Sequence, residues 1–381
     1  MGKFVINKMF DKKNAMSKIT TNRIKEIDIA RAFAIILVVI GHAVAYQCVN
    51  NYENINYDLV MIEHGITDSI IHHWFLRLSE TIYLFHMPLF FAVSGAAFAV
   101  SMAKRDENNN YLRYPTLWSL VVDKGKRLLI PFVVITLFWD IPVKYLAGVY
   151  KGLSKKEVIQ HGIEGQLLLR GNSYLWFLIA LFGIFVVVYV LEKHIESTAV
   201  KIYLLILLNF LRYAIPNHFT YATMENSIYF YIGYLWYSHR EWYNQKVREK
   251  RWLIPGMLVF LLFAEYIKNI KTLAGWELFS KYLGIAAGVI LFYAIALKIA
   301  ESQRSEQRWI HTMTVYGMGI YLYAEPMNYL ILRVFVHYFS PNALGSEVGG
   351  AFLFLLRTVG VTLLSIIIVK ILKQTKIKYI Y

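Results

Sequence analysis

The chain has 381 residues, of which 57% are hydrophobic and 16% aromatic, and its mean hydropathy is +0.44. This composition excludes an ordinary soluble globular protein and predicts a chain that is embedded in a membrane. The formal net charge of +15 comes from basic residues between apolar stretches, so we interpret them as topology signals and predict no nucleic-acid binding.

About 20 mostly apolar residues are needed for a helix to span a bilayer, and ten such segments follow one another along the chain. We therefore predict an all-α, polytopic membrane protein with about ten transmembrane helices in one bundle. The predicted spans are residues 28–46, 81–103, 128–149, 174–191, 200–216, 222–238, 252–268, 278–300, 313–337 and 349–371. They divide the chain into a cytoplasmic segment (1–27), a transmembrane domain (28–371) and a cytoplasmic tail (372–381).

The charges of the connecting segments predict the orientation, because cytoplasmic loops are rich in Lys and Arg. Residues 1–27 carry seven Lys or Arg against two acids, and residues 239–251 carry five against two. Residues 47–80 carry one basic residue against five acids. Both termini are therefore predicted to be cytoplasmic. Residues 150–173, with four basic residues on the outer side, do not follow this pattern, and we interpret them as a half-buried or re-entrant segment.

The first span carries three ionisable residues on one face. Asp28, Arg31 and His42 follow a helical stripe, and the eleven residues from Arg31 to His42 make a rise of about 16 Å. Charged groups in hydrocarbon are costly and normally mark function. His42 is the candidate base, since imidazole takes a proton near neutral pH. Arg31 is a candidate phosphate ligand, or else a snorkelling interfacial residue, and Asp28 is a catalytic candidate or the ion-pair partner of Arg31.

Further candidates follow along the chain. His86 opens the second span and is equally compatible with a structural hydrogen bond and a site role. Ser94 and Gly95 favour close helix packing over catalysis. The basic cluster of Lys124, Lys126 and Arg127 is either ordinary positive-inside charge or a grip for the phosphates of a nucleotide-like donor. On the acceptor side we place His86, Ser94, Asp140 and Trp176, as site or structural residues.

Glu325 is a carboxylate deep in the ninth span and a candidate partner that orients His42 or shares its proton. Asp140, close to a helix break at Pro142, is a similar candidate. Trp176 has the simpler interpretation of an interfacial anchor. The adjacent His72 and His73 have no third ligand at a useful spacing, so we predict no metal site, and the single Cys48 excludes an internal disulfide.

These segments together resemble the integral-membrane acyltransferases of the acyltransferase-3 type, bacterial enzymes that O-acetylate exported polysaccharides and related glycans. The resemblance covers about residues 24–371. It rests on Glu26 to Arg31 and His42, on the run from Leu84 to Phe91 followed by Ser94-Gly95, on the basic residues before Leu128-Leu129-Ile130-Pro131, and on Trp176-Phe177-Leu178. The resemblance maps the family's essential histidine and arginine onto His42 and Arg31. Its arginine-rich motif maps onto Lys124 to Arg127, where only Arg127 is an arginine.

The resemblance implies a bacterial cytoplasmic (inner) membrane protein that transfers an acyl group, acetyl in the first instance, from acyl-CoA to a sugar hydroxyl of a glycan or lipid-linked sugar. Acetyl-CoA is then a co-substrate, and no cofactor is held tightly. We expect His42, oriented by Glu325 or another buried acid, to deprotonate the hydroxyl or to carry the acyl group itself. Arg31 and the basic cluster are expected to hold the phosphates of the donor.

Two other readings of the residues stay open. Buried His, Arg, Asp and Glu also suit a proton-coupled transporter or flippase for a lipid-linked saccharide. A structural membrane subunit of a polysaccharide assembly complex is the third possibility. Release of free thiol from acetyl-CoA on addition of a glycan distinguishes the enzyme from the other two.

Overall fold

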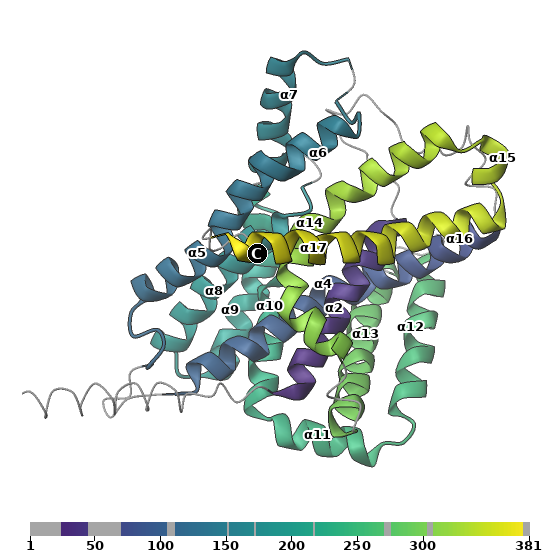
Figure 1. The fold of residues 1–381 in the computed structure, drawn as a ribbon. Helices are drawn as coiled ribbons and strands as arrows, with labels where there is room; N and C mark the ends of the chain where they lie inside the picture. Colours follow the sequence, from purple (N-terminus) through teal and green to yellow (C-terminus); the bar gives the residue numbers. More distant parts are fainter. Residues whose placement is uncertain are drawn as a thin grey trace, which may run out of the picture.

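The fold is described from a computed structural model that covers residues 24–44, 70–104, 111–150, 152–170, 173–215, 218–269, 276–302 and 308–375. Cys48, the tail beyond residue 375 and most of the predicted N-terminal segment lie outside these ranges. The described elements are helices, as the sequence predicts (Figure 1). Their bounds are α2 (Lys25–Val44), α4 (Ile70–Met102), α5 (Leu117–Ile135), α6 (Ile141–Leu146), α7 (Lys155–Gly162), α8 (Trp176–His194), α9 (Thr198–Leu211), α10 (His218–Ser238), α11 (Arg240–Glu249), α12 (Leu253–Asn269), α13 (Trp276–Glu301), α14 (Arg308–Tyr338), α15 (Pro341–Leu344), α16 (Glu347–Leu355) and α17 (Val361–Gln374).

In the described ranges, three π-helical turns interrupt or extend these helices. They are η2 (Thr136–Asp140) between α5 and α6, η3 (Ile163–Leu167) after α7, and η5 (Leu356–Gly360) between α16 and α17. A π turn inserts one extra residue into a helix, and such turns occur frequently at functional sites.

Among the described residues, five helical stretches are long and apolar enough to cross a membrane: Ile70–Met102, Leu117–Leu146, Trp176–His194, Trp276–Glu301 and Glu347–Gln374. Each overlaps a span predicted from the sequence. The other five predicted spans coincide with α2, α9, α10, α12 and α14. The protein is therefore a polytopic, all-helical membrane protein.

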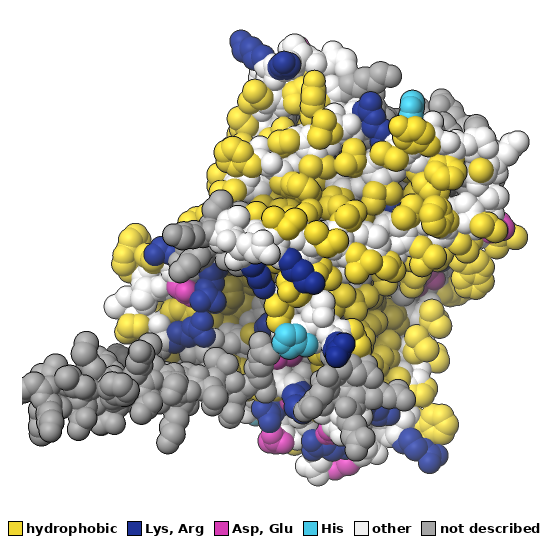
Figure 2. Space-filling model, viewed as in Figure 1, with side chains coloured by type: hydrophobic (Ala, Val, Ile, Leu, Met, Phe, Trp, Pro, Cys, Tyr) yellow, Lys and Arg dark blue, Asp and Glu magenta, His cyan; other side chains and the backbone are white. Residues whose placement is uncertain are grey.

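Hydrophobic side chains cover much of the visible surface, and charged side chains gather toward its lower end, where α11 lies (Figures 1 and 2). Exposed apolar residues of this kind include Val259 at 65%, Leu363 at 56% and Ile367 at 50% exposure. A water-soluble surface avoids such continuous apolar area, whereas lipid chains solvate it. α7 lies at the opposite end of the molecule from α11, so the segment 150–173 and the basic segment 239–251 are on different sides.

α2 lies in the middle of the bundle, packed against α4, α13 and α14. Its apolar residues Ile29, Ala32 and Ala34 are almost fully buried. The ionisable residues Asp28, Arg31 and His42 are only partly buried. This placement brings the last turn of α2 next to α14 and η5.

α4 and α10 approach until their backbones touch. A Cβ atom at Gly95 would lie 1.9 Å from the Phe230 carbonyl oxygen, and one at Gly233 would lie 1.9 Å from the Ala92 carbonyl oxygen. Small residues permit this approach in membrane helices. The packing role predicted for Gly95 is therefore confirmed.

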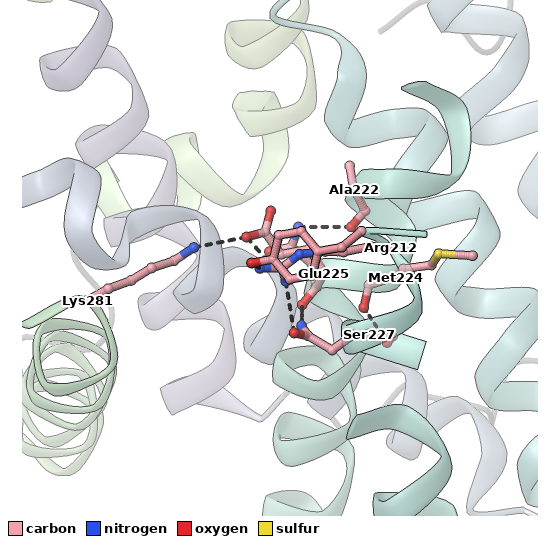
Figure 3. A network of polar contacts seen from close by, with 9 residues as sticks. Arg212, Ala222, Met224, Glu225, Ser227 and Lys281 are labelled. Carbon is pink, nitrogen blue, oxygen red and sulfur yellow. Dashed lines mark hydrogen bonds and ion pairs between the residues drawn. The ribbon is translucent and has the colours of Figure 1, made fainter. Parts of the chain in front are cut away.

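A network of charged residues joins the N-terminal half of α10 to α13 and to the residues after α9 (Figure 3). Glu225 accepts from Lys281 of α13 at 2.9 Å and lies 3.5 Å from Arg212, just after α9. Arg212 is 4% exposed and also donates to Asn209. The pairing with Glu225 allows Arg212 to be buried, because an unpaired buried charge would be strongly destabilising.

Substitution of Gly95 tests the α4–α10 contact. Gly95→Ala should lower stability by about 1–3 kcal/mol or more, because the added methyl group overlaps the Phe230 carbonyl. Thermal unfolding in detergent measures the change. Gly256→Ala in α12 is the matched control, since a Cβ atom there meets nothing within 4 Å. Equal melting temperatures for the two variants would contradict the contact.

Candidate active site

A cavity of about 230 Å³ lies where α2, α4, the start of α8, α14 and η5 meet. It is lined by two histidines, two charged residues, five other aromatic residues and three further residues. They are His42, His86, Glu325, Arg357, Tyr83, Tyr174, Trp176, Tyr321, Tyr329, Val38, Met87 and Asn328. The predicted site residues His42, His86, Trp176 and Glu325 are thus brought together. A pocket with aromatic walls and a few converging polar groups is typical of a small-molecule site.

His42 lies in the last turn of α2, and its position depends on Arg357. Arg357 is 1% exposed, and its Nη2 donates to the carbonyl oxygen of His42 at 3.4 Å. This bond joins η5 to the backbone of α2 and holds His42 at the cavity.

His86 contributes a second imidazole, which is 3% exposed. Its Nδ1 lies 2.9 Å from the Ile82 carbonyl oxygen. Because a carbonyl only accepts, Nδ1 must carry the hydrogen, and Nε2 of the neutral ring is left as an acceptor. The two roles that the sequence left open for His86, a structural hydrogen bond and a place in the site, are combined in one side chain.

Glu325 lines the same cavity as His42, without a direct hydrogen bond between them. Tyr329 Oη donates to Glu325 Oε1 at 2.7 Å. Among the described residues, Glu325 Oε2 and both side-chain amide atoms of Asn328 are buried without a hydrogen-bond partner. Buried polar atoms are nearly always paired, so such a group at a cavity wall indicates a place for a polar ligand.

Pro326 explains how α8 is joined to α14. A proline lacks an N–H, so the carbonyl of Leu322 four residues earlier has no helical partner. Tyr174 Oη donates to that oxygen at 2.6 Å, and Tyr321 Oη donates back to the Tyr174 carbonyl at 2.6 Å. Trp139 Nε1 donates to the next carbonyl, that of Tyr323, at 3.2 Å. These bonds hold one wall of the cavity.

Asp140 is fully buried and does not line the cavity. It forms an ion pair of 3.3 Å with Lys144, whose exposure is 1%. With its amide in the alternative orientation, Gln166 of η3 bonds to both. The carboxylate that the sequence placed on the acceptor side thus belongs to a polar cluster behind the aromatic wall, with Lys144 5.4 Å from the ring of Tyr329.

The predicted donor residues lie toward the other end of α2. Asp28 pairs with Arg31 at 3.7 Å, and neither lines the cavity. Asp28 is fourteen residues before His42, a helical rise of about 21 Å. Of the two roles left open for Asp28, the structure shows the ion pair with Arg31 and places the carboxylate away from His42.

The basic cluster has three different environments. Lys124 lies over the ring of Phe185 at 3.9 Å, Lys126 is exposed, and Arg127 pairs with Asp123 at 3.2 Å. Tyr114 donates to the same aspartate at 2.8 Å, and burial together with this bond raises the pKa of Tyr114 to about 12. Neither this cluster nor Ser94 lines the cavity.

Side chains fill most of the space beside the face of α2 that runs from Arg31 to His42. The open space below His42 is about 10 Å³, lined among others by Ile35, Val38, Phe90 and Tyr321. That volume holds about one water molecule. The rings of Phe90 and Tyr321 are further joined through Phe177, with centroids 4.9 and 5.7 Å apart. A chain-like substrate passes only if these side chains move.

Sequence reasoning missed Arg357, Lys144 and Asn328. The first two carry a signal that was available, because each is an ionisable residue inside a predicted span and therefore costly. Asn328, as a neutral residue within a span, carries a weaker one. The contact of Arg357 with a residue 315 positions earlier has no counterpart in local sequence.

The sequence model of a protein family described as an acyltransferase domain, the acyltransferase-3 domain, matches residues 24–370. All twelve residues that line the cavity lie within this range. Comparison with curated proteins found no match, and neither did comparison with solved structures.

The Asp140–Lys144 pair generates a prediction about stability. Lys144→Met should destabilise the protein by about 3–5 kcal/mol, because it leaves a buried carboxylate without its cation. The double variant Asp140→Asn/Lys144→Met should lose much less. Thermal unfolding in detergent measures both, with the exposed Lys155→Met as control. A double variant that is no more stable than the single one would argue against the pair.

Proposed function

Because the chain belongs to the acyltransferase-3 family of membrane acyltransferases, we propose that it transfers an acyl group, specifically acetyl, from acyl-CoA to a sugar hydroxyl of a surface or exported glycan. The observation that carries the proposal is the cavity at the end of α2. It combines two imidazoles with a carboxylate and an amide whose buried atoms lack partners among the described residues.

His42 acts as the general base in this proposal. The acceptor O–H gives its proton to the imidazole as the oxygen attacks the thioester carbonyl. A C–O bond forms, the C–S bond breaks, and the thiolate of CoA leaves and takes the proton back from His42. The carrier alternative, in which His42 is itself acylated first, uses the same position and ends in the same products.

The remaining lining residues suit a sugar ring. Glu325 Oε2 and the Asn328 amide offer acceptors and donors for hydroxyl groups, and Nε2 of His86 offers another acceptor. Tyr83 and Trp176 present aromatic rings to the same space. A site built to bond several hydroxyl groups rejects analogues that lack them, because its buried polar atoms would stay unpaired.

The donor enters from the opposite end in this proposal. Arg31, Lys124, Lys126 and Arg127 bind the phosphates of acyl-CoA at the cytoplasmic mouth, and the pantetheine arm extends along α2. Because Phe90 and Tyr321 fill the space beside this part of α2, their rings must move before the thioester reaches His42. The protein then lies in a bacterial inner membrane with both termini in the cytoplasm, and acyl-CoA is a co-substrate rather than a resident cofactor.

Substitution of His42 tests the base. His42→Ala should lower acyl transfer at least about 100-fold, because a positioned general base contributes roughly 10²- to 10⁴-fold. The measurement is thiol release from acetyl-CoA by purified protein with added glycan, alongside mass spectrometry of the glycan. His311→Ala, at an exposed histidine in α14, is the control. A fully active His42→Ala protein would remove His42 from the mechanism, and a wild type that releases no thiol would favour a transporter.

Arg31→Lys tests the donor end. Loss of the bidentate fork should raise the KM for acyl-CoA about tenfold with little change in kcat, since one charge-assisted hydrogen bond is lost. Steady-state kinetics with varied acyl-CoA measures the effect. Arg248→Lys, whose guanidinium pairs with Glu301 at the same end of the molecule, is the control. If KM stays unchanged, Arg31 serves the placement of α2 instead.

A further inference from the structure

A second, larger cavity of about 670 Å³ lies between α10 and α13, with α4 behind it and α11 at one end. It shares no lining residue with the cavity at His42. Its volume falls within the roughly 300–1,000 Å³ that small-molecule sites occupy. Nothing in the proposed acyl transfer uses it.

The walls of this cavity are apolar, and they open toward lipid. Small residues of α4, among them Ala92, Val93 and Ala96, form its back. Ile232 of α10 and Ile290 of α13 also line it, and they are 53% and 41% exposed. Water in such a space would find few polar partners, and an empty space would cost its lining many dispersion contacts. A hydrocarbon chain from the bilayer fills it without either cost.

One end of the cavity is polar and positive. Lys246 and Lys250, one helical turn apart on and just after α11, are both lining residues. The two arginines of α11 pair with acids, Arg240 with Glu26 at 3.4 Å and Arg248 with Glu301 at 2.6 Å. Lys246 forms an ion pair of 2.9 Å with Glu249, and both side chains are 44% exposed, whereas no described residue forms an ion pair with Lys250. Lys250 is therefore available to an anion, and Lys246 supplies a second, partly exposed positive charge one turn away.

α11 has the composition of an interfacial helix. Asn244 and Val247 are its buried residues, whereas Trp242 and Tyr243 are 57% and 41% exposed. Aromatic residues beside lysines mark the level of lipid headgroups. In Figure 1, α11 lies across the lower end of α13, where such a level is expected.

From this arrangement we propose that the cavity binds an anionic phospholipid, with an acyl chain between α10 and α13 and the headgroup phosphate on Lys246 and Lys250. The lipid comes from the leaflet on the side of α11. Bound there, it fills the space between α10 and α13 and ties the interfacial helix to the bundle. The proposal does not depend on the acyl-transfer chemistry.

Photocrosslinking in vesicles tests the proposal. The full-length protein is reconstituted with phosphatidylglycerol or phosphatidylcholine that carries a diazirine near the chain end, and crosslinked peptides are mapped by mass spectrometry. Crosslinks should concentrate on the lining segments of α4, α10 and α13, with phosphatidylglycerol favoured. Removal of each lysine should lower the preference for phosphatidylglycerol about fivefold. One basic residue near an anionic lipid surface contributes about 1 kcal/mol of binding free energy, which corresponds to this factor.

Two variants of the cavity and one control variant complete the test. Lys246→Gln/Lys250→Gln should abolish the headgroup preference, whereas Lys155→Gln/Lys156→Gln, at two exposed lysines of α7, should keep it. Val289→Phe, at a partly buried lining residue, should lower crosslinking by both lipids. Equal yields for the two lipids spread over all exposed helices would overturn the proposal. Displacement of the crosslinks by acetyl-CoA would overturn it too, because the cavity would then be a donor site.

Discussion

The carbonyl of His42 and the guanidinium of Arg357 form the contact on which the rest of the site depends. In hydrocarbon, no water satisfies a helix end or a charge, so each must find a partner inside the protein. Here the guanidinium of Arg357 finds a partner in the backbone of α2. The imidazole of His42 is therefore presented to the cavity from a backbone that a residue 315 positions later holds in place.

The same need for partners explains the irregular backbone around the site. η2 carries Asp140, η3 carries Gln166 and η5 carries Arg357, so each described π turn places a polar side chain among buried neighbours. Pro326 frees a carbonyl, and Tyr174 satisfies it. Polar groups that are costly in lipid thus join the helices. The hydrogen bonds of Tyr174 and Tyr321 also fix these two aromatic residues in the wall of the cavity.

The two cavities divide the bundle by chemistry. The one at His42 is small, polar and closed from the Arg31 end by aromatic side chains, which suits a reaction that must exclude water. The one between α10 and α13 is larger, apolar and open to the bilayer, with lysines only at the headgroup level. α4 lines both cavities, with Tyr83, His86 and Met87 at the first and Ala92, Val93 and Ala96 at the second.

Helix content, the approximate spans and the candidate status of His42, His86 and Glu325, which line one cavity, were predictable from local sequence. Apolar length and ionisable residues within it have large costs in a bilayer. The distance of Asp28 from His42 follows from helical rise alone, whereas the separation of Asp140 from the cavity and the contact of Arg357 with His42 were not predictable. These depend on which helix faces meet after folding, and a contact 315 residues apart leaves no local pattern. The sequence by itself thus determined a membrane bundle with buried charges, and only the tertiary structure decided which of them share one site.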